Sequence, residues 1–105
     1  MAEIAARVLI KVRLYLEKLR KSGIMISKAY IFGSHAKGQA DKWSDINIAI
    51  VSPQIGEDSF EERVRLTRMA ISVDDRLEPL PFNPETFNDD DPFVKKIKNE
   101  GLAVN

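Results

Sequence analysis

Apolar and charged positions follow a helical period along the first twenty or so residues. Apolar residues recur every three or four positions, at Ile4, Val8, Val12, Tyr15, Leu16 and Leu19. The pattern predicts an amphipathic helix over Ala2–Lys21 that ends at Ser22-Gly23. Because apolar side chains cover more than half of its circumference, we expect this helix to pack against a core rather than lie on a membrane.

Three stretches have the pattern of strands. Ile24–Phe32 predicts a turn followed by a strand, and Ser44–Val51 alternates polar and apolar residues before it becomes a continuous apolar run. The third strand, Arg76–Phe82, contains Pro79 and Pro81. Since proline has no amide hydrogen, prolines at alternate positions leave one side of a strand without donors. This strand is therefore expected at the edge of the sheet.

A second helix is predicted at about Ser59–Val73, with Asp58 or Ser59 as its cap. Its expected buried side consists of Phe60, Val64, Thr67 and Ile71.

The last part of the chain predicts a loop with a helical turn near residues 85–87, followed by a third helix. Asp91 has the position of an N-cap and Pro92 that of the first helical residue. The helix is expected to run to about Asn99, to end at Gly101 and to point Phe93 and Ile97 inward. Leu102-Ala103-Val104 could add a short strand.

The predicted order is therefore α-β-β-α-β-α, in one domain over residues 1–105. Two strands joined only by a polar turn and a short loop favour a mixed sheet. The fold class expected is α/β (α+β), a small mixed β-sheet packed with helices on one or both faces.

Composition narrows the functional classes. The chain has 105 residues, a formal net charge of zero and no cysteine. No cysteine means no thiol catalysis, thiolate zinc site or disulfide, and it fits a cytoplasmic protein. Neutral charge gives no support for nucleic-acid binding. The N-terminal pattern is neither a signal peptide nor a membrane span.

The candidate chemistry lies between Gly33 and Val51. Gly33-Ser34 follows a buried strand, so it offers a backbone without a Cβ, a hydroxyl and free amides that can hold phosphate. Lys37 can reach the same phosphate. Asp45 and Asn47 project from one face of the next strand, and Glu78 is the candidate third ligand for Mg²⁺.

Ordinary structural roles are the alternatives for these and neighbouring residues. Asp45 could cap a turn with Ser44, and Glu78 could be an edge-strand charge that discourages aggregation. His35 is expected to be solvated, and Trp43 to be a partly buried anchor of its loop. The run Asp89-Asp90-Asp91 suits helix capping better than metal binding.

Gly33-Ser34, ten intervening residues and Asp45-x-Asn47 together resemble the glycine-serine, spacer, Asp-x-Asp signature of the minimal nucleotidyltransferases, a branch of the DNA polymerase β-like nucleotidyltransferase superfamily. The resemblance extends over nearly the whole chain. It includes the leading helix, the strand SDINIAIV, the acidic strand with prolines and the closing helix FVKKIKNEG.

The resemblance implies the nucleotidyltransferase fold and transfer of a nucleotide from ATP or another nucleoside triphosphate, with release of pyrophosphate. Gly33, Ser34 and Lys37 would bind the β- and γ-phosphates. Asp45 would ligate two Mg²⁺ ions, and Glu78 would serve the ion that activates the acceptor hydroxyl.

Asn47 departs from the family signature, which has aspartate at this position. An amide oxygen can ligate Mg²⁺ but brings no negative charge, so two carboxylates would face two divalent ions. We expect the acceptor-side ion to bind weakly and transfer to be slow or absent.

The resemblance also implies a partner, because minimal nucleotidyltransferases are typically paired with a helical HEPN-domain protein. Some neutralise that protein as an antitoxin by adding AMP to one of its tyrosines. Two alternatives stay open: a catalytically impaired module that blocks its partner by contact, and nucleotidyl transfer to RNA or a small molecule. Whether the chain forms a homo-oligomer is also open.

Overall fold

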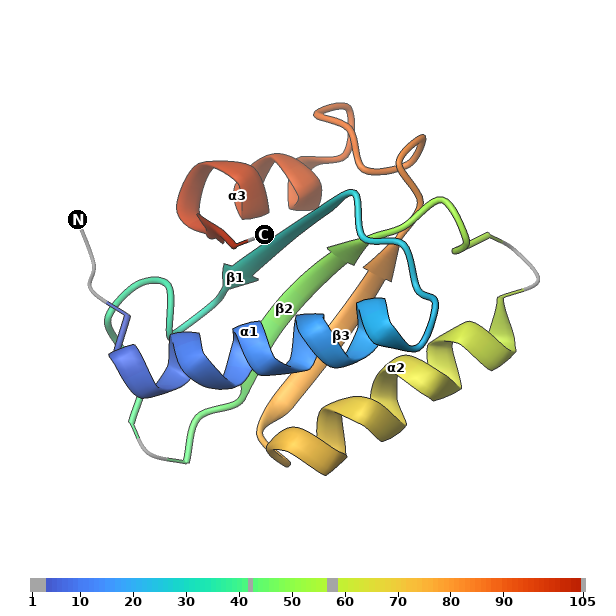
Figure 1. Cartoon of the computed structure of the whole chain (residues 1–105). Helices are drawn as coiled ribbons and strands as arrows, with labels where there is room; N and C mark the ends of the chain where they lie inside the picture. Colours follow the sequence, from blue (N-terminus) through green and yellow to red (C-terminus); the bar gives the residue numbers. More distant parts are fainter. Residues whose placement is uncertain (1–3, 42, 57–58, 105) are drawn as a thin grey trace.

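A four-stranded mixed sheet with helices on both faces forms the centre of the computed structural model (Figure 1). The structure describes residues 4–41, 43–56 and 59–104. The elements are α1 (Ala6–Lys21), β1 (Lys28–Phe32), β2 (Ile46–Val51), α2 (Phe60–Val73), β3 (Leu77–Phe82), α3 (Pro92–Glu100) and β4 (Leu102–Ala103). The predicted order and fold class are confirmed, and the short strand after the last helix is present.

The strand order is β3-β2-β1-β4. β1 is antiparallel to β2 and β4, whereas β2 and β3 are parallel. The Ile46 amide donates to the Arg76 carbonyl at 2.7 Å, and the Ser52 amide donates to the Phe82 carbonyl at 2.9 Å. The backbone amides and carbonyls of even-numbered β3 residues therefore point towards β2. The backbones of Pro79 and Pro81 point to the outer edge, beside which the described part of the chain forms no further strand. The edge position predicted from the prolines is confirmed.

The larger hydrophobic cluster lies between the sheet and the helices α1 and α2. Alternation along β2 directs Ile46, Ile48 and Ile50 into it. The predicted apolar positions of α1 from Val8 to Leu19 are all buried, and α1 begins four residues later than predicted, with residues 1–3 outside the described part. The Tyr15 hydroxyl donates to the Leu66 carbonyl at 2.8 Å and so links α1 to α2.

The buried side predicted for α2 is wrong. Leu66 and Ala70 are its buried residues, while Phe60 is 77% exposed and Ile71 is 60% exposed. The helix has two apolar stripes at helical spacing, and contact with α1 and β3 buries the one that contains Leu66. Of the two predicted caps, Asp58 lies outside the described residues, and the Ser59 side chain makes no cap hydrogen bond.

The smaller cluster lies on the opposite face, beneath α3. Val94 and Ile97 of α3 pack there against Ala49 and Val51 of β2. Asp91 caps the helix as predicted, since its Oδ1 accepts a hydrogen bond from the Phe93 amide at 2.9 Å. Ile97 points inward, as predicted. The inward position predicted for Phe93 is met only in part, because its ring centroid lies 5.9 Å from that of Phe32 but the side chain is 46% exposed. No helix within the described ranges could cross a membrane.

Candidate functional site

The turn after β1 is held by glycine at both ends. Gly33 has φ of 80° and Gly38 has φ of 71°, a region that favours glycine because a Cβ would clash with the backbone. The Gly33 carbonyl accepts hydrogen bonds from the amides of Ala36 at 3.1 Å and Lys37 at 3.2 Å. The helical turn predicted to start at Ser34 is therefore present.

Free amides gather at the start of this turn. Within the part of the chain that the structure describes, the amides of Ser34 and His35 have no acceptor. Consecutive unpaired amides that follow a left-handed residue form an anion-binding concavity, and their dipoles favour negative charge. The turn can hold phosphate.

Asn47 occupies the centre of a row of side chains across three strands. It is the Cα partner of Phe32 on β1 and of Glu78 on β3. Partners across adjacent strands share a face, so the side chains of Asn47 and Glu78 point the same way, with Cα atoms about 5 Å apart. A Cβ built on Gly33 would lie 2.7 Å from Asn47 Nδ2. The turn and the row are thus in contact.

Asp45 precedes Asn47 by two residues and is exposed, as is Glu78. Alternation along the chain assigns all three side chains to the sheet face that carries α3. Carboxylate and amide oxygens are hard ligands of the type that Mg²⁺ prefers, so the donor set fits that ion. In the described residues no three histidine, cysteine or acidic side chains converge, which agrees with the neutral amide at position 47.

His35 ties the turn to the segment that precedes Asp45. Its side chain is only 8% exposed, so the predicted solvated position is wrong. Nε2 lies 3.2 Å from the Ser44 carbonyl, and because a carbonyl only accepts, Nε2 carries the proton. Gly38, Ala40 and Asp41 line a small pocket together with His35. A single polar histidine in a polar turn gave no periodic signal for this burial.

The start of β2 is held by a second polar contact. Arg76 Nη2 lies 2.9 Å from Asp74 Oδ2, and the Arg76 carbonyl accepts the Ile46 amide beside Asp45. The hydrogen bond from the Arg76 guanidinium lowers the pKa of Asp74 to about 2. This ion pair lies just before β3, beside the point where the chain enters β2 after Asp45.

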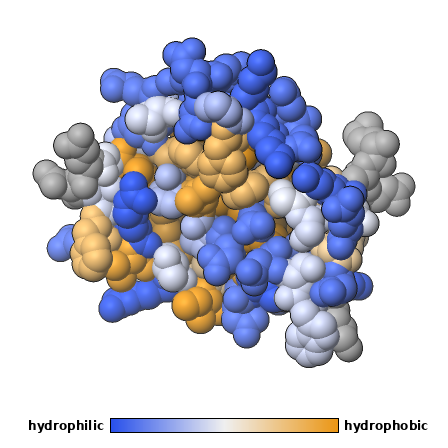
Figure 2. Space-filling view, turned by 180° about the vertical axis from the view of Figure 1, so that it is seen from behind, coloured by the Kyte–Doolittle hydropathy of each residue, from blue (hydrophilic) through white to orange (hydrophobic). Residues whose placement is uncertain are grey.

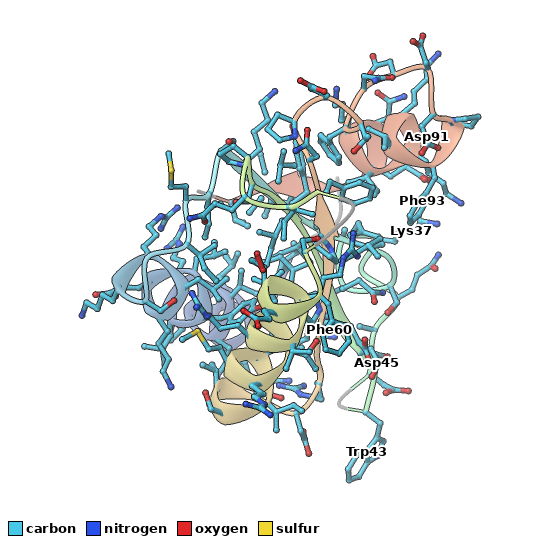
Figure 3. All side chains as sticks on the ribbon, turned by 90° about the vertical axis from the view of Figure 1, so that its right-hand side faces the viewer. Lys37, Trp43, Asp45, Phe60, Asp91 and Phe93 are labelled. Carbon is cyan, nitrogen blue, oxygen red and sulfur yellow. The ribbon has the colours of Figure 1, made fainter. Side chains whose placement is uncertain are left out.

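A pocket of about 240 Å³ separates the turn from α3. Its walls combine aromatic, aliphatic and charged residues, namely Phe32, Gly33, Lys37, Phe93, Lys96, Ile97 and Glu100. Lys37 Nζ lies 3.7 Å from Glu100 Oε1, a pair exposed to solvent. Figure 3 shows Lys37 and Phe93 close together near α3. Figure 2, which views the side away from α1, has an apolar area at its centre with hydrophilic residues around it.

Structural roles were predicted from the sequence for two other features, namely Trp43 and the acidic run before α3. Trp43 is 76% exposed and projects from its loop, so its predicted partial burial is wrong (Figure 3). The acidic run before α3 caps the helix, as predicted, and it also forms an ion pair that was not predicted. Asp91 is the cap, and Asp89 Oδ1 lies 2.9 Å from Lys98 Nζ, which lowers the pKa of Asp89.

Comparison with known proteins agrees with this geometry. Residues 9–104 match the model of the nucleotidyltransferase domain family. The fold matches a crystal structure from Sulfolobus solfataricus that is provisionally assigned as a nucleotidyltransferase, with a TM-score of 0.65 and 21% sequence identity. That match covers 92% of this chain and 78% of the other. No curated protein matches the sequence.

Proposed function

This chain belongs to the nucleotidyltransferase domain family, and we propose that it binds a nucleoside triphosphate, ATP in the first instance, with Mg²⁺. The observation that carries the proposal is the contact between the turn and the row. Gly33, which directly precedes the two free amides, lies against the side chain of Asn47, the Cα partner of Glu78. A phosphate group at these amides would lie beside the oxygen ligands.

Each residue has a defined part in this proposal. The amides of Ser34 and His35 bind the terminal phosphates, and Lys37 can turn from Glu100 towards them because its ion pair is long and solvated. Asp45, Asn47 and Glu78 would hold Mg²⁺. When bound, the ion neutralises triphosphate charge and lowers the pKa of the acceptor hydroxyl. Glu78 would accept the hydroxyl proton.

Asn47 is expected to limit the rate of nucleotide transfer. It supplies an oxygen but no charge, and its amide lies against Gly33. We propose that one Mg²⁺ ion enters with the triphosphate and that the second, acceptor-side ion binds weakly, so nucleotide binding exceeds turnover.

The acceptor is proposed from the resemblance alone. It would be a tyrosine hydroxyl of a helical HEPN-domain protein, which the chain would neutralise as an antitoxin. If Asn47 prevents transfer, the chain would act instead as a module that blocks this protein by contact. Transfer to RNA has less support, because the net charge is zero.

The test is a comparison of Asn47→Asp, Asp45→Asn and the natural chain in transfer of labelled AMP from ATP. Water and the co-expressed HEPN-domain protein serve as acceptors. We expect Asn47→Asp to raise the rate at least tenfold, because it restores the third carboxylate. Asp45→Asn is the matched control and should abolish transfer. Equal rates for all three chains would overturn the proposal.

A further inference from the structure

An apolar stripe runs along the outer side of α2. It consists of Phe60, Val64, Thr67 and Ile71, and is called the outer stripe below. Phe60 and Ile71 are 77% and 60% exposed. The spacing of four, three and four residues is that of the contact positions in a pair of coiled helices. Such a seam is completed by a second helix.

Charged residues of opposite sign flank the outer stripe on one side. Glu61 follows Phe60 and Arg68 follows Thr67, so both occupy the same flank, two helical turns apart. In the ranges that the structure describes, neither side chain has an ion-pair partner. Together with Phe60, Val64 and Arg65 they line a pocket of about 260 Å³.

These charges select an antiparallel pairing of α2 with a second copy of the same helix. About a two-fold axis near the middle of the stripe, Phe60 meets the partner's Ile71 and Val64 meets the partner's Thr67. Glu61 then lies beside the partner's Arg68, and the symmetry repeats this pair. A parallel pairing would place Arg63 beside the partner's Arg68, which is repulsive.

The neighbouring sheet edge cannot provide the same association. Pro79 and Pro81 face the outer edge of β3 and have no amide hydrogen. The carbonyls of a second strand would find no donor at these two positions of β3, so pairing of sheets edge to edge is disfavoured. The helix face is the available surface on this side of the chain.

We infer that the outer stripe of α2 is a self-association surface, through which two copies of this chain pack antiparallel with reciprocal Glu61 and Arg68 pairs. The inference is independent of the proposed nucleotide site. The stripe extends about 16 Å along the helix, which makes the contact small and the dimer dependent on concentration.

Sedimentation equilibrium over a range of protein concentrations tests this surface. The natural chain should approach twice its monomer mass as concentration rises. Glu61→Arg and Arg68→Glu should each weaken association at least about tenfold, since each creates two like-charge pairs. The double variant with both reversals restores opposite charges and should associate as the natural chain does.

Two further variants distinguish association through the outer stripe from non-specific association through other exposed apolar residues. Ile71→Asp should be monomeric, whereas Ile10→Asp, at a 64% exposed apolar position on α1, should still associate. Circular dichroism checks that each variant is folded. A natural chain that stays monomeric, or a double reversal that fails to associate, would overturn the inference. The inference would also be overturned if the outer stripe bound a different protein but not a second copy of this chain.

Discussion

At the scale of single residues, Gly33 meets two independent constraints. Its φ of 80° is strained for other residues, and an added Cβ would lie 2.7 Å from Asn47 Nδ2. We expect Gly33→Ala to lower the free energy of unfolding by about 1–2 kcal/mol. It should also weaken ATP binding at least tenfold, because the free amides of the turn would move.

Calorimetric titration with Mg·ATP and urea denaturation measure the two effects. Gly56→Ala is the matched control, since among the described residues a Cβ at Gly56 has no atom within 4 Å, and its φ is not positive. If both variants bind ATP alike, the turn is not the phosphate site.

The His35 ring joins the turn to Ser44, which directly precedes Asp45 and the start of β2. We expect His35→Ala to weaken Mg²⁺-dependent ATP binding, because it removes the donor to the Ser44 carbonyl and leaves a cavity. His35→Gln retains a donor and should recover part of the affinity. Comparison of ATP affinity with and without Mg²⁺ checks this, and equal affinities for natural, Ala and Gln chains would contradict it.

The residues of the candidate site could be predicted from the sequence, but the burial or exposure of individual side chains near it could not. The glycine-serine turn, its helical geometry and the shared face of Asn47 and Glu78 follow from local spacing and strand alternation. The burial of His35 and the exposure of Trp43 do not, because both depend on how the loop between the strands folds back.

At the scale of elements, the ion pair between Asp74 and Arg76 sets a pH dependence. The pKa of Asp74 is lowered to about 2 from its ordinary value of 3.8. A lowered carboxyl pKa means that the stabilisation is present above about pH 4 and is lost as the pH falls towards 2. Asp74→Asn should remove roughly 2 kcal/mol at neutral pH and flatten the pH dependence in this window.

Urea denaturation at several pH values between about 2 and 7 measures the effect. Asp90→Asn serves as the control, because Asp90 is exposed and makes no ion pair within the described ranges. An unchanged profile for Asp74→Asn would show that the pair does not stabilise the fold.

Most elements could be predicted because each has its own period or cap. The seam of α1, the edge prolines of β3 and the Asp91-Pro92 start of α3 are local signals. The buried side of α2 could not be predicted this way. Its two apolar stripes are equivalent until α1 and β3 are in place, so tertiary contact decides between them.

At the scale of the whole molecule, the helices cover one face of the sheet more completely than the other. Two long helices protect one face, and the short α3 covers part of the other, which leaves the Asn47 and Glu78 end open. The strand order that creates this asymmetry is not written in any local pattern, because β3 returns to pair with β2 only after α2 has crossed the sheet.

A ligand at the open end should stabilise the entire chain by linkage. With ATP and Mg²⁺ at about 100 times the dissociation constant, the gain is about 2.7 kcal/mol, enough to raise Tm by several degrees. Removal of Mg²⁺ with a chelator should reduce the shift, and Asp45→Asn should reduce it as well. If Mg·ATP leaves Tm unchanged, the chain does not bind it.

Gly33 leaves room for the side chain at position 47, whether that residue is asparagine or aspartate. Asparagine and aspartate have nearly the same shape, and their codons differ by one transition in the first base. Gain or loss of a third carboxylate is therefore a single mutational step that needs no compensating change in the surrounding strands. A population carrying this gene could move between the two chemical states of the site within one round of selection.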